Sequence, residues 1–112
     1  MLPEPLESLR RVKTYDPKQF GSCVVFFVRK KAGESTLMYI GATENLPYYT
    51  VLMEKKAEQY GWSFTDVYYI PASVDFMDAI ARALVAHYKP VMNSRRTYSR
   101  TDRRILHQLG LT

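Results

Sequence analysis

The fold is decided by the stretch Tyr39-Ile40-Gly41-Ala42-Thr43-Glu44-Asn45-Leu46. Its aromatic and β-branched start favours a strand, and its glycine favours a turn where that strand ends. Asn45 or Thr43 then offers the short polar side chain that caps a helix, and Pro47 falls in the first turn, where a missing N–H is tolerated. The stretch therefore predicts a strand that runs through a turn into a helix over residues 47–59.

A second stretch, Tyr88-Lys89-Pro90-Val91-Met92-Asn93, predicts the end of another helix. Pro90 has no N–H and cannot continue an α-helix, so the chain must leave the helix there. Asn93 lies just beyond this stop. We expect its side chain to fasten the turn after Pro90 by hydrogen bonds to the backbone.

The remaining elements follow from hydrophobic periodicity and from turn residues. The sequence predicts a short amphipathic helix or turn over 4–13, strands over 24–28, 36–41 and 64–70, a polar hairpin loop over 29–35, and helices over 75–88 and 101–110. The expected caps are Ser73 or Asp75 and Thr101, with Gly110 just after the last helix. The apolar side chains expected to face the core are Val51, Leu52 and Ala57 in the first long helix and Phe76, Ile80, Ala83, Leu84 and Val85 in the second.

The elements follow one another in the order α-β-β-α-β-α-α, which is typical of the α+β class. We expect a small antiparallel three-stranded sheet flanked by helices. At 112 residues the chain has the length of one domain. We divide it into an N-terminal extension over 1–21, a core over 22–93 and a basic C-terminal segment over 94–112.

Composition excludes several classes of protein. Hydrophobic residues make up 46% of the chain, which favours a packed core over disorder. No run approaches the roughly 18 apolar residues of a membrane span, and Met1–Pro5 does not resemble a secretory signal. The lone Cys23 excludes an intrachain disulfide and fits a reducing compartment. We therefore expect a cytoplasmic protein with no membrane partner, and the sequence leaves its oligomeric state open.

The positive charge is concentrated near the C-terminus. The chain has 16 basic and 11 acidic residues, for a net charge of +5. The segment 94–112 holds Arg95, Arg96, Arg100, Arg103 and Arg104 against Asp102 as its one acidic residue. Such a cluster is typical of a surface that contacts phosphates, and equally of a solvated polar tail.

Together the two stretches resemble the GIY-YIG nuclease domain, over about residues 22–93. The resemblance rests on the string Tyr-Ile-Gly-x-Thr-x-Asn-Leu at 39–46 and on Lys-Pro-x-x-Asn at 89–93. It implies a GIY-YIG-like fold. In that family, a pair of tyrosines, an arginine and a glutamate that binds a divalent cation hydrolyse a phosphodiester.

Most of the residues that cut in the family are replaced in this chain. The resemblance implies that Tyr39 and Asn93 are retained, as the tyrosine of the second strand and the terminal asparagine. The replaced positions are Phe26 for the first tyrosine, Tyr49 for the arginine, Met53 for a histidine or tyrosine one turn later, and Ala81 for the glutamate.

These replacements remove the chemistry that hydrolysis requires. Ala81 has no oxygen for Mg²⁺, which takes oxygen ligands. Phe26 has no hydroxyl, and Tyr49 lacks the cationic fork of arginine. We therefore expect a non-catalytic relative of the nucleases, with no metal site and no cofactor.

A relocated site is the alternative to that conclusion. Asp78 or Glu54, acting with Arg82, would supply a carboxylate and a cation, and Mg²⁺ would then be the cofactor. The other interpretation of these residues, and of Glu58, is that they form the solvated faces of amphipathic helices.

Three functional hypotheses follow, in this order. The first is a non-catalytic module that binds nucleic acid. The second is a protein-interaction or inhibitor module of the phage or mobile-element type on the same scaffold. The third is an active GIY-YIG endonuclease with a rearranged site. The residues expected to bind nucleic acid are Tyr48, Tyr49, Lys89, Arg95, Arg96, Arg100, Arg103 and Arg104.

Overall fold

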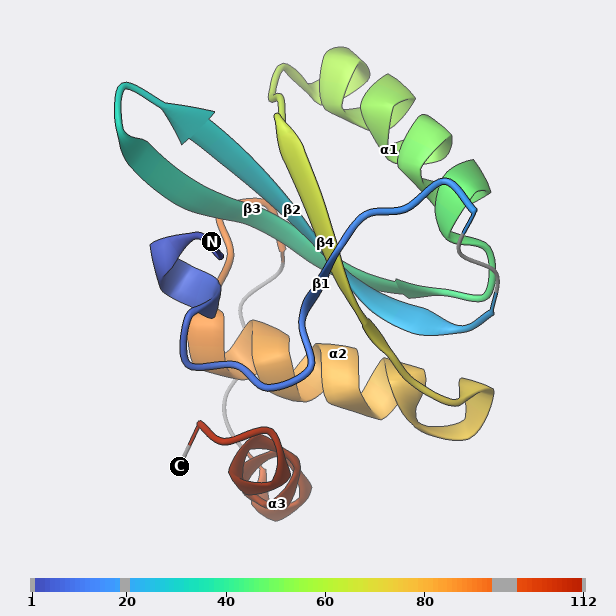
Figure 1. Cartoon of the computed structure of the whole chain (residues 1–112), viewed down its shortest axis with the longest axis vertical. Coiled ribbons are helices and arrows are strands. Elements are labelled where there is room, and N and C mark those ends of the chain that lie inside the picture. The colour runs from blue at the N-terminus through green and yellow to red at the C-terminus, as the bar shows by residue number, and fades with distance from the viewer. Residues whose placement is uncertain (1, 19–20, 94–98, 112) are drawn as a thin grey trace.

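A computed structural model describes residues 2–18, 21–93 and 99–111 of the chain. Four antiparallel strands form one sheet in the order β1-β4-β2-β3, and three α-helices pack around it (Figure 1). The chain therefore has an α+β fold. The elements are a short 3₁₀ helix Glu4–Leu6, β1 Lys13–Thr14, β2 Cys23–Lys31, β3 Glu34–Thr43, α1 Leu46–Tyr60, β4 Asp66–Pro71, α2 Val74–Tyr88 and α3 Arg100–Gln108.

The sheet has one strand more than the sequence predicted. The additional strand is β1, whose two residues pair with Tyr69 and Tyr68 of β4. Both β1 residues are exposed and polar, so no hydrophobic alternation marks them as a strand. The helix or turn expected over 4–13 is reduced to the 3₁₀ turn, because its leucines, Leu6 and Leu9, are buried in the main core instead of forming one face of a helix.

Both faces of the sheet are covered, α1 lying on one and α2 on the other, with α3 packed outside α2 (Figure 1). In the central strand β2, Val24, Phe26 and Val28 join the core beneath α2, whereas Val25 and Phe27 join the core beneath α1. Successive strand residues point to opposite faces. A strand covered on both sides therefore carries a continuous apolar run, as the sequence of β2 does.

The helices bury partly different side chains from those predicted. In α1 the buried residues are Leu46, Thr50, Met53 and Ala57, and Val51 is 52% exposed. Thr50 can lie in this buried stripe because its hydroxyl donates a hydrogen bond to the Leu46 carbonyl (2.9 Å). The buried polar group is thereby satisfied. In α2 the predicted Ala83, Leu84 and Val85 are buried, but Phe76 is 65% exposed.

The helix caps are confirmed in part. The Asn45 side chain accepts a hydrogen bond from the Tyr48 N–H (3.2 Å) and caps α1 as predicted. The cap of α3 is Ser99, not Thr101. Its hydroxyl accepts from the Asp102 N–H (3.1 Å), and the Asp102 carboxylate accepts from the Ser99 N–H (2.9 Å). This reciprocal pair fixes where the basic helix begins.

Within the described residues, none of the helices has the length and apolar character needed to cross a membrane.

Cys23 should be chemically inert in the folded chain. Its side chain is fully buried at the start of β2, and that burial raises the pKa of the thiol to about 11. Little thiolate then exists at pH 8, and thiolate is the reactive form. We expect a disulfide reagent such as DTNB to react with the native chain far more slowly than with the chain in urea at the same pH. Equal rates in the two states would contradict this burial.

Candidate nucleic-acid interface

The outer edge of β3 is covered by the residues that follow α2. The Val91 N–H donates to the Leu37 carbonyl (3.3 Å), and the Met92 N–H donates to the Met38 carbonyl (2.8 Å). The Asn93 side chain then accepts from the Ile40 N–H (2.8 Å) and donates to the Ile40 carbonyl (2.9 Å). Asn93 therefore bonds to backbone, as predicted, but its partner is β3 and not the turn after Pro90.

A hollow of about 790 Å³ lies along this edge, between α1, β3 and α2. We call it the β3 hollow. Four of the positions singled out by the family resemblance line it, and α2 adds a carboxylate and a cation. The lining residues that matter here are Tyr39, Gly41, Tyr49, Asp78, Ala81, Arg82 and Asn93. Segments distant in the sequence are thus brought to one place.

Phe26 does not line the β3 hollow, because it lies on the other face of the sheet. It pairs with Ile40 and is buried beneath α2. The side chain that pairs with Tyr39 on the α1 side is Phe27, with ring centroids 6.3 Å apart. The ladder is irregular next to this pair: Phe27 pairs with Tyr39 but Val28 pairs with Leu37, so Met38 is left without an opposite residue. This one-residue bulge accompanies the pairing of Tyr39 with Phe27.

Tyr49 is turned into the wall of the β3 hollow and is only half-exposed, unlike its neighbour Tyr48, which is 67% exposed. Its ring packs near that of Phe27, with centroids 5.9 Å apart. Burial, the nearby Tyr39 and a side-chain hydrogen bond with Tyr39 all raise the pKa of Tyr49. The phenol stays protonated at neutral pH, so it cannot act as a general base there.

Gly41 makes room for this tyrosine. A side chain at residue 41 would collide with the Tyr49 hydroxyl, and its Cβ would lie 2.9 Å from the Tyr49 Cζ. The glycine of the Tyr-Ile-Gly motif is therefore required by packing.

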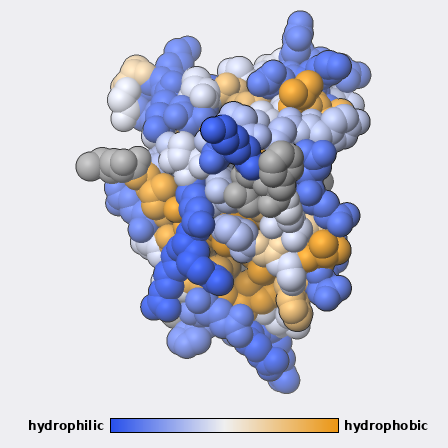
Figure 2. Space-filling view, turned by 45° about the vertical axis from the view of Figure 1, so that its right-hand side comes forward, coloured by the Kyte–Doolittle hydropathy of each residue, from blue (hydrophilic) through white to orange (hydrophobic). Residues whose placement is uncertain are grey.

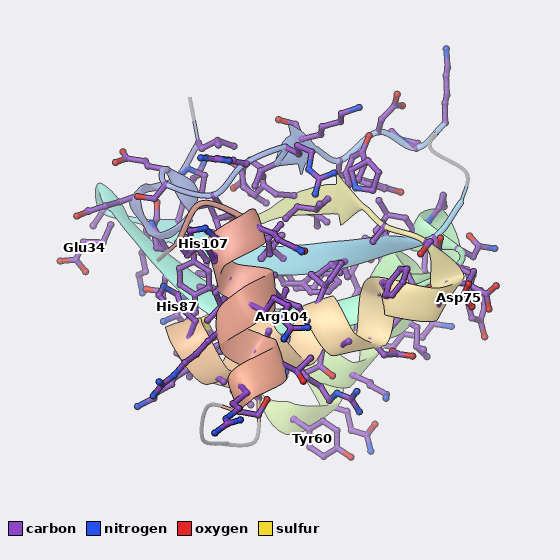
Figure 3. All side chains as sticks on the ribbon, turned by 90° about the horizontal axis from the view of Figure 1, so that it is seen from below. Glu34, Tyr60, Asp75, His87, Arg104 and His107 are labelled. Carbon is purple, nitrogen blue, oxygen red and sulfur yellow. The ribbon has the colours of Figure 1, made fainter. Side chains whose placement is uncertain are left out.

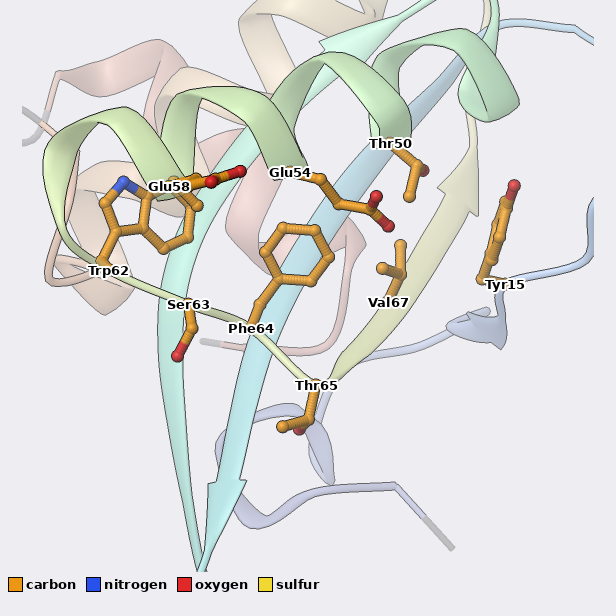
Figure 4. A pocket seen from close by; sticks show the side chains of 10 residues that line it. Tyr15, Thr50, Glu54, Glu58, Trp62, Ser63, Phe64, Thr65 and Val67 are labelled. Atoms are coloured by element: carbon orange, nitrogen blue, oxygen red, sulfur yellow. The ribbon is translucent and has the colours of Figure 1, made fainter.

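The charged groups of the β3 hollow come from α2. Asp78 and Arg82 are exposed, one turn apart, and both line the hollow. Glu54 does not: with Glu58 it lines a different cavity, of about 580 Å³, whose walls include Trp62 and Phe64 (Figure 4). A relocated site built from Glu54 and Arg82 is therefore not formed, whereas one built from Asp78 and Arg82 is brought together. Among the described residues, no three His, Cys, Asp or Glu side chains gather as a metal site.

The basic surface continues from the β3 hollow onto α3. Arg82 also lines a smaller hollow, of about 340 Å³, together with Ser99 and Thr101 at the start of α3. Three arginines of α3 are exposed, Arg100, Arg103 and Arg104, of which Figure 3 labels Arg104. Lys89 is exposed at the end of α2. Arg95 and Arg96 lie outside the described residues.

A smaller cavity adjoins the β3 hollow. It has a volume of about 270 Å³ and shares Tyr39 and Met92 with the hollow. Its other walls are Met53, Lys56, Tyr60 and Trp62. Met53, where the resemblance implies a histidine or tyrosine, is thus next to the β3 hollow and not within it. Neither Tyr60 nor Lys56 was predicted as a site residue; the available signal was a tyrosine directly before the helix-ending Gly61.

The Gly41 and Tyr49 contact can be tested by a double-mutant cycle. We expect Gly41→Ala to destabilise the fold by about 1–3 kcal/mol, the usual cost of forcing extra volume into a packed site. In a Tyr49→Phe background the hydroxyl that collides is gone, so the same change should cost less. Urea denaturation of the four proteins measures this coupling. Identical costs in both backgrounds would contradict the described packing.

Comparisons of the chain with protein-family models, with curated proteins and with solved structures found no match. What this surface does is therefore inferred from its own chemistry.

Proposed function

We propose that the chain is a non-catalytic module that binds nucleic acid on a GIY-YIG-like scaffold. The observation that carries the proposal is the position of Arg82, which lines both the β3 hollow and the smaller hollow at the start of α3, the helix that carries three exposed arginines. Phosphate groups of a strand crossing this surface would meet guanidinium groups along their path. The surface comprises Arg82, Lys89, Arg100, Arg103 and Arg104.

The charges of this surface are available to a ligand. Among the described residues, one ion pair joins Lys30 of β2 to Asp66 of β4 (3.4 Å). This pair includes no residue of α3. The α3 arginines have no acidic partner within the described part of the chain. The helix's own Asp102 is buried and engaged in the cap with Ser99. Free guanidinium groups bind phosphate oxygens through paired hydrogen bonds.

The same region supports binding without cleavage. Ala81, at the place where the family carries its metal-binding glutamate, presents only a methyl group to the β3 hollow. The raised pKa of Tyr49 keeps its phenol protonated. A strand held in the hollow would then meet no carboxylate at residue 81 to hold a cation and, at Tyr49, no phenol ready to accept a proton.

One observation favours a second candidate, an active endonuclease with a relocated carboxylate. Asp78 shares the β3 hollow with Arg82 and Tyr39. Mg²⁺ is often held by one or two carboxylates with water completing its shell. Cleavage that depends on Asp78 would favour this candidate over the first.

Nucleic-acid binding should depend steeply on salt. Each lost phosphate contact lowers the slope of log K against log salt by about 0.9 on duplex DNA. We therefore expect Arg103→Ala/Arg104→Ala to lower the slope by about 2 and to weaken binding at low salt. Fluorescence anisotropy of a labelled duplex and of a labelled single strand, measured over a range of salt concentrations, tests this.

The matched control is Lys31→Ala/Lys55→Ala. It removes the same charge from two exposed residues, at the tip of the β2–β3 hairpin and on α1. Its slope and affinity should stay close to those of the unmodified chain. An affinity that does not change with salt, or an equal loss in both double variants, would contradict the proposal.

A further inference from the structure

The small cavity beside the β3 hollow has walls of unusual composition for a surface. We call it the aromatic cavity: Tyr39, Met53, Lys56, Tyr60, Trp62 and Met92 line it. Tyr60 is 68% exposed, and the Tyr39 and Trp62 rings lie with centroids 6.4 Å apart at 34°. Hydrophilic side chains cover most of the molecular face in Figure 2, with hydrophobic patches separated from one another. Tyr60 is exposed at the rim of this cavity, whereas Tyr39 and Trp62 are half-buried in its wall.

The size and charge of the aromatic cavity restrict what it holds. Its volume of about 270 Å³ is below the range of roughly 300–1,000 Å³ that is typical of pockets for drug-sized molecules. One planar ring system is the size of group that suits it. Among the described residues, Lys56 is the one charged side chain in its walls, so an anionic group attached to the ring would be favoured.

The position of the aromatic cavity connects it to the basic surface. Tyr39 and Met92 separate it from the β3 hollow and line both spaces. Arg82 stands in the hollow on one side of this pair, and Lys56 in the cavity on the other. The two carboxylates of α1 nearest to this end, Glu54 and Glu58, line the cavity in Figure 4 instead. A phosphate approaching along the edge of β3 thus meets Arg82 on one side of Tyr39 and Lys56 on the other, with the Asp78 carboxylate one turn from Arg82 in the same hollow.

We propose that the aromatic cavity receives one unpaired base of a single strand whose backbone follows the β3 hollow. This inference rests on the proposed function and adds a preference for unpaired nucleotides over duplex. A base in a duplex is stacked and paired and cannot enter a separate cavity, whereas an unpaired base stacks readily on tyrosine or tryptophan. Tyr60, exposed at the last residue of α1 (Figure 3), is the ring most accessible to such a base.

Trp62 provides a direct readout, because it is the only tryptophan in the chain. We expect its fluorescence to be quenched when oligothymidylate of about ten nucleotides binds, a length within the usual site size. A duplex of equal length should bind with little quenching. Tyr60→Ala should weaken single-strand binding about five- to a hundredfold, the range expected for the loss of one stacked base. Tyr60→Phe, which keeps the ring, should restore it.

The matched control is Phe76→Ala, in the first turn of α2. Phe76 is nearly as exposed as Tyr60, at 65% against 68%, but does not line the aromatic cavity. The single strand should quench Trp62 in this variant as fully as in the unmodified chain. Circular dichroism would confirm that each variant is folded.

The outcomes separate the two proposals. If labelled single strand and duplex both fail to bind, the proposed function is wrong and this inference falls with it. If both bind with a steep salt dependence but Trp62 is not quenched, or Tyr60→Ala binds the single strand unchanged, the proposed function stands and the base-binding cavity is wrong. Equal quenching by thymidine monophosphate at the same nucleotide concentration would also overturn it, because the cavity would then recognise a free nucleotide.

Discussion

The hydrogen bonds between the Pro90–Asn93 segment and the edge of β3 hold the candidate site together. Without them β3 would present a row of unpaired N–H and C=O groups at the edge of the sheet, a common route to aggregation. The Asn93 side chain takes the place of a neighbouring strand, because it accepts a hydrogen bond from the Ile40 N–H and donates one to the Ile40 carbonyl. The same attachment fixes the end of α2 beside the sheet and places Met92 between the two cavities. Protection of the edge and construction of the site are thus one structural feature.

A second constraint sets the chemistry inside the β3 hollow. Gly41 leaves the space that Tyr49 fills, and Tyr49 lines the hollow together with Tyr39. In the family that the chain resembles, a cationic arginine is expected where Tyr49 stands. Here the position carries a neutral phenol whose pKa is raised by burial. Positive charge is found instead on Arg82 and on the exposed side of α3. The residues proposed to bind phosphate, Arg82 and the arginines of α3, therefore lie at other positions than the arginine of the nuclease family.

Much of this arrangement could be predicted, because it depends on sequence patterns within single elements. The buried run of β2, the cap at Asn45 and the helix stop at Pro90 are short-range signals, and each predicted its element. Tyr39, Tyr49, Ala81 and Asn93 were expected at one site and do line one hollow.

The features that were missed depend on contacts between distant segments. The exposed pair Lys13–Thr14 becomes a strand only because β4 has a free edge beside it. Phe26 was expected at the place of the first tyrosine, but the residue that pairs with Tyr39 is Phe27, and a bulge at Met38 that no residue preference predicts accompanies this register. The aromatic cavity lies between the end of α1 and Met92, which are distant in the sequence. Neither segment alone has a sequence pattern that predicts a cavity. Strand register and contacts between distant segments determine each of these features, and the conformational preferences of single residues do not.

The central claim is that this chain holds nucleic acid and leaves it intact. The most direct measurement is one native gel of labelled single-stranded and duplex DNA incubated with the protein in Mg²⁺ and in Mn²⁺, followed by a denaturing gel of the same samples. The account predicts shifted bands on the first gel and full-length strands on the second. Shortened strands that disappear when Asp78→Asn is used would contradict it, and would identify the β3 hollow as an active site.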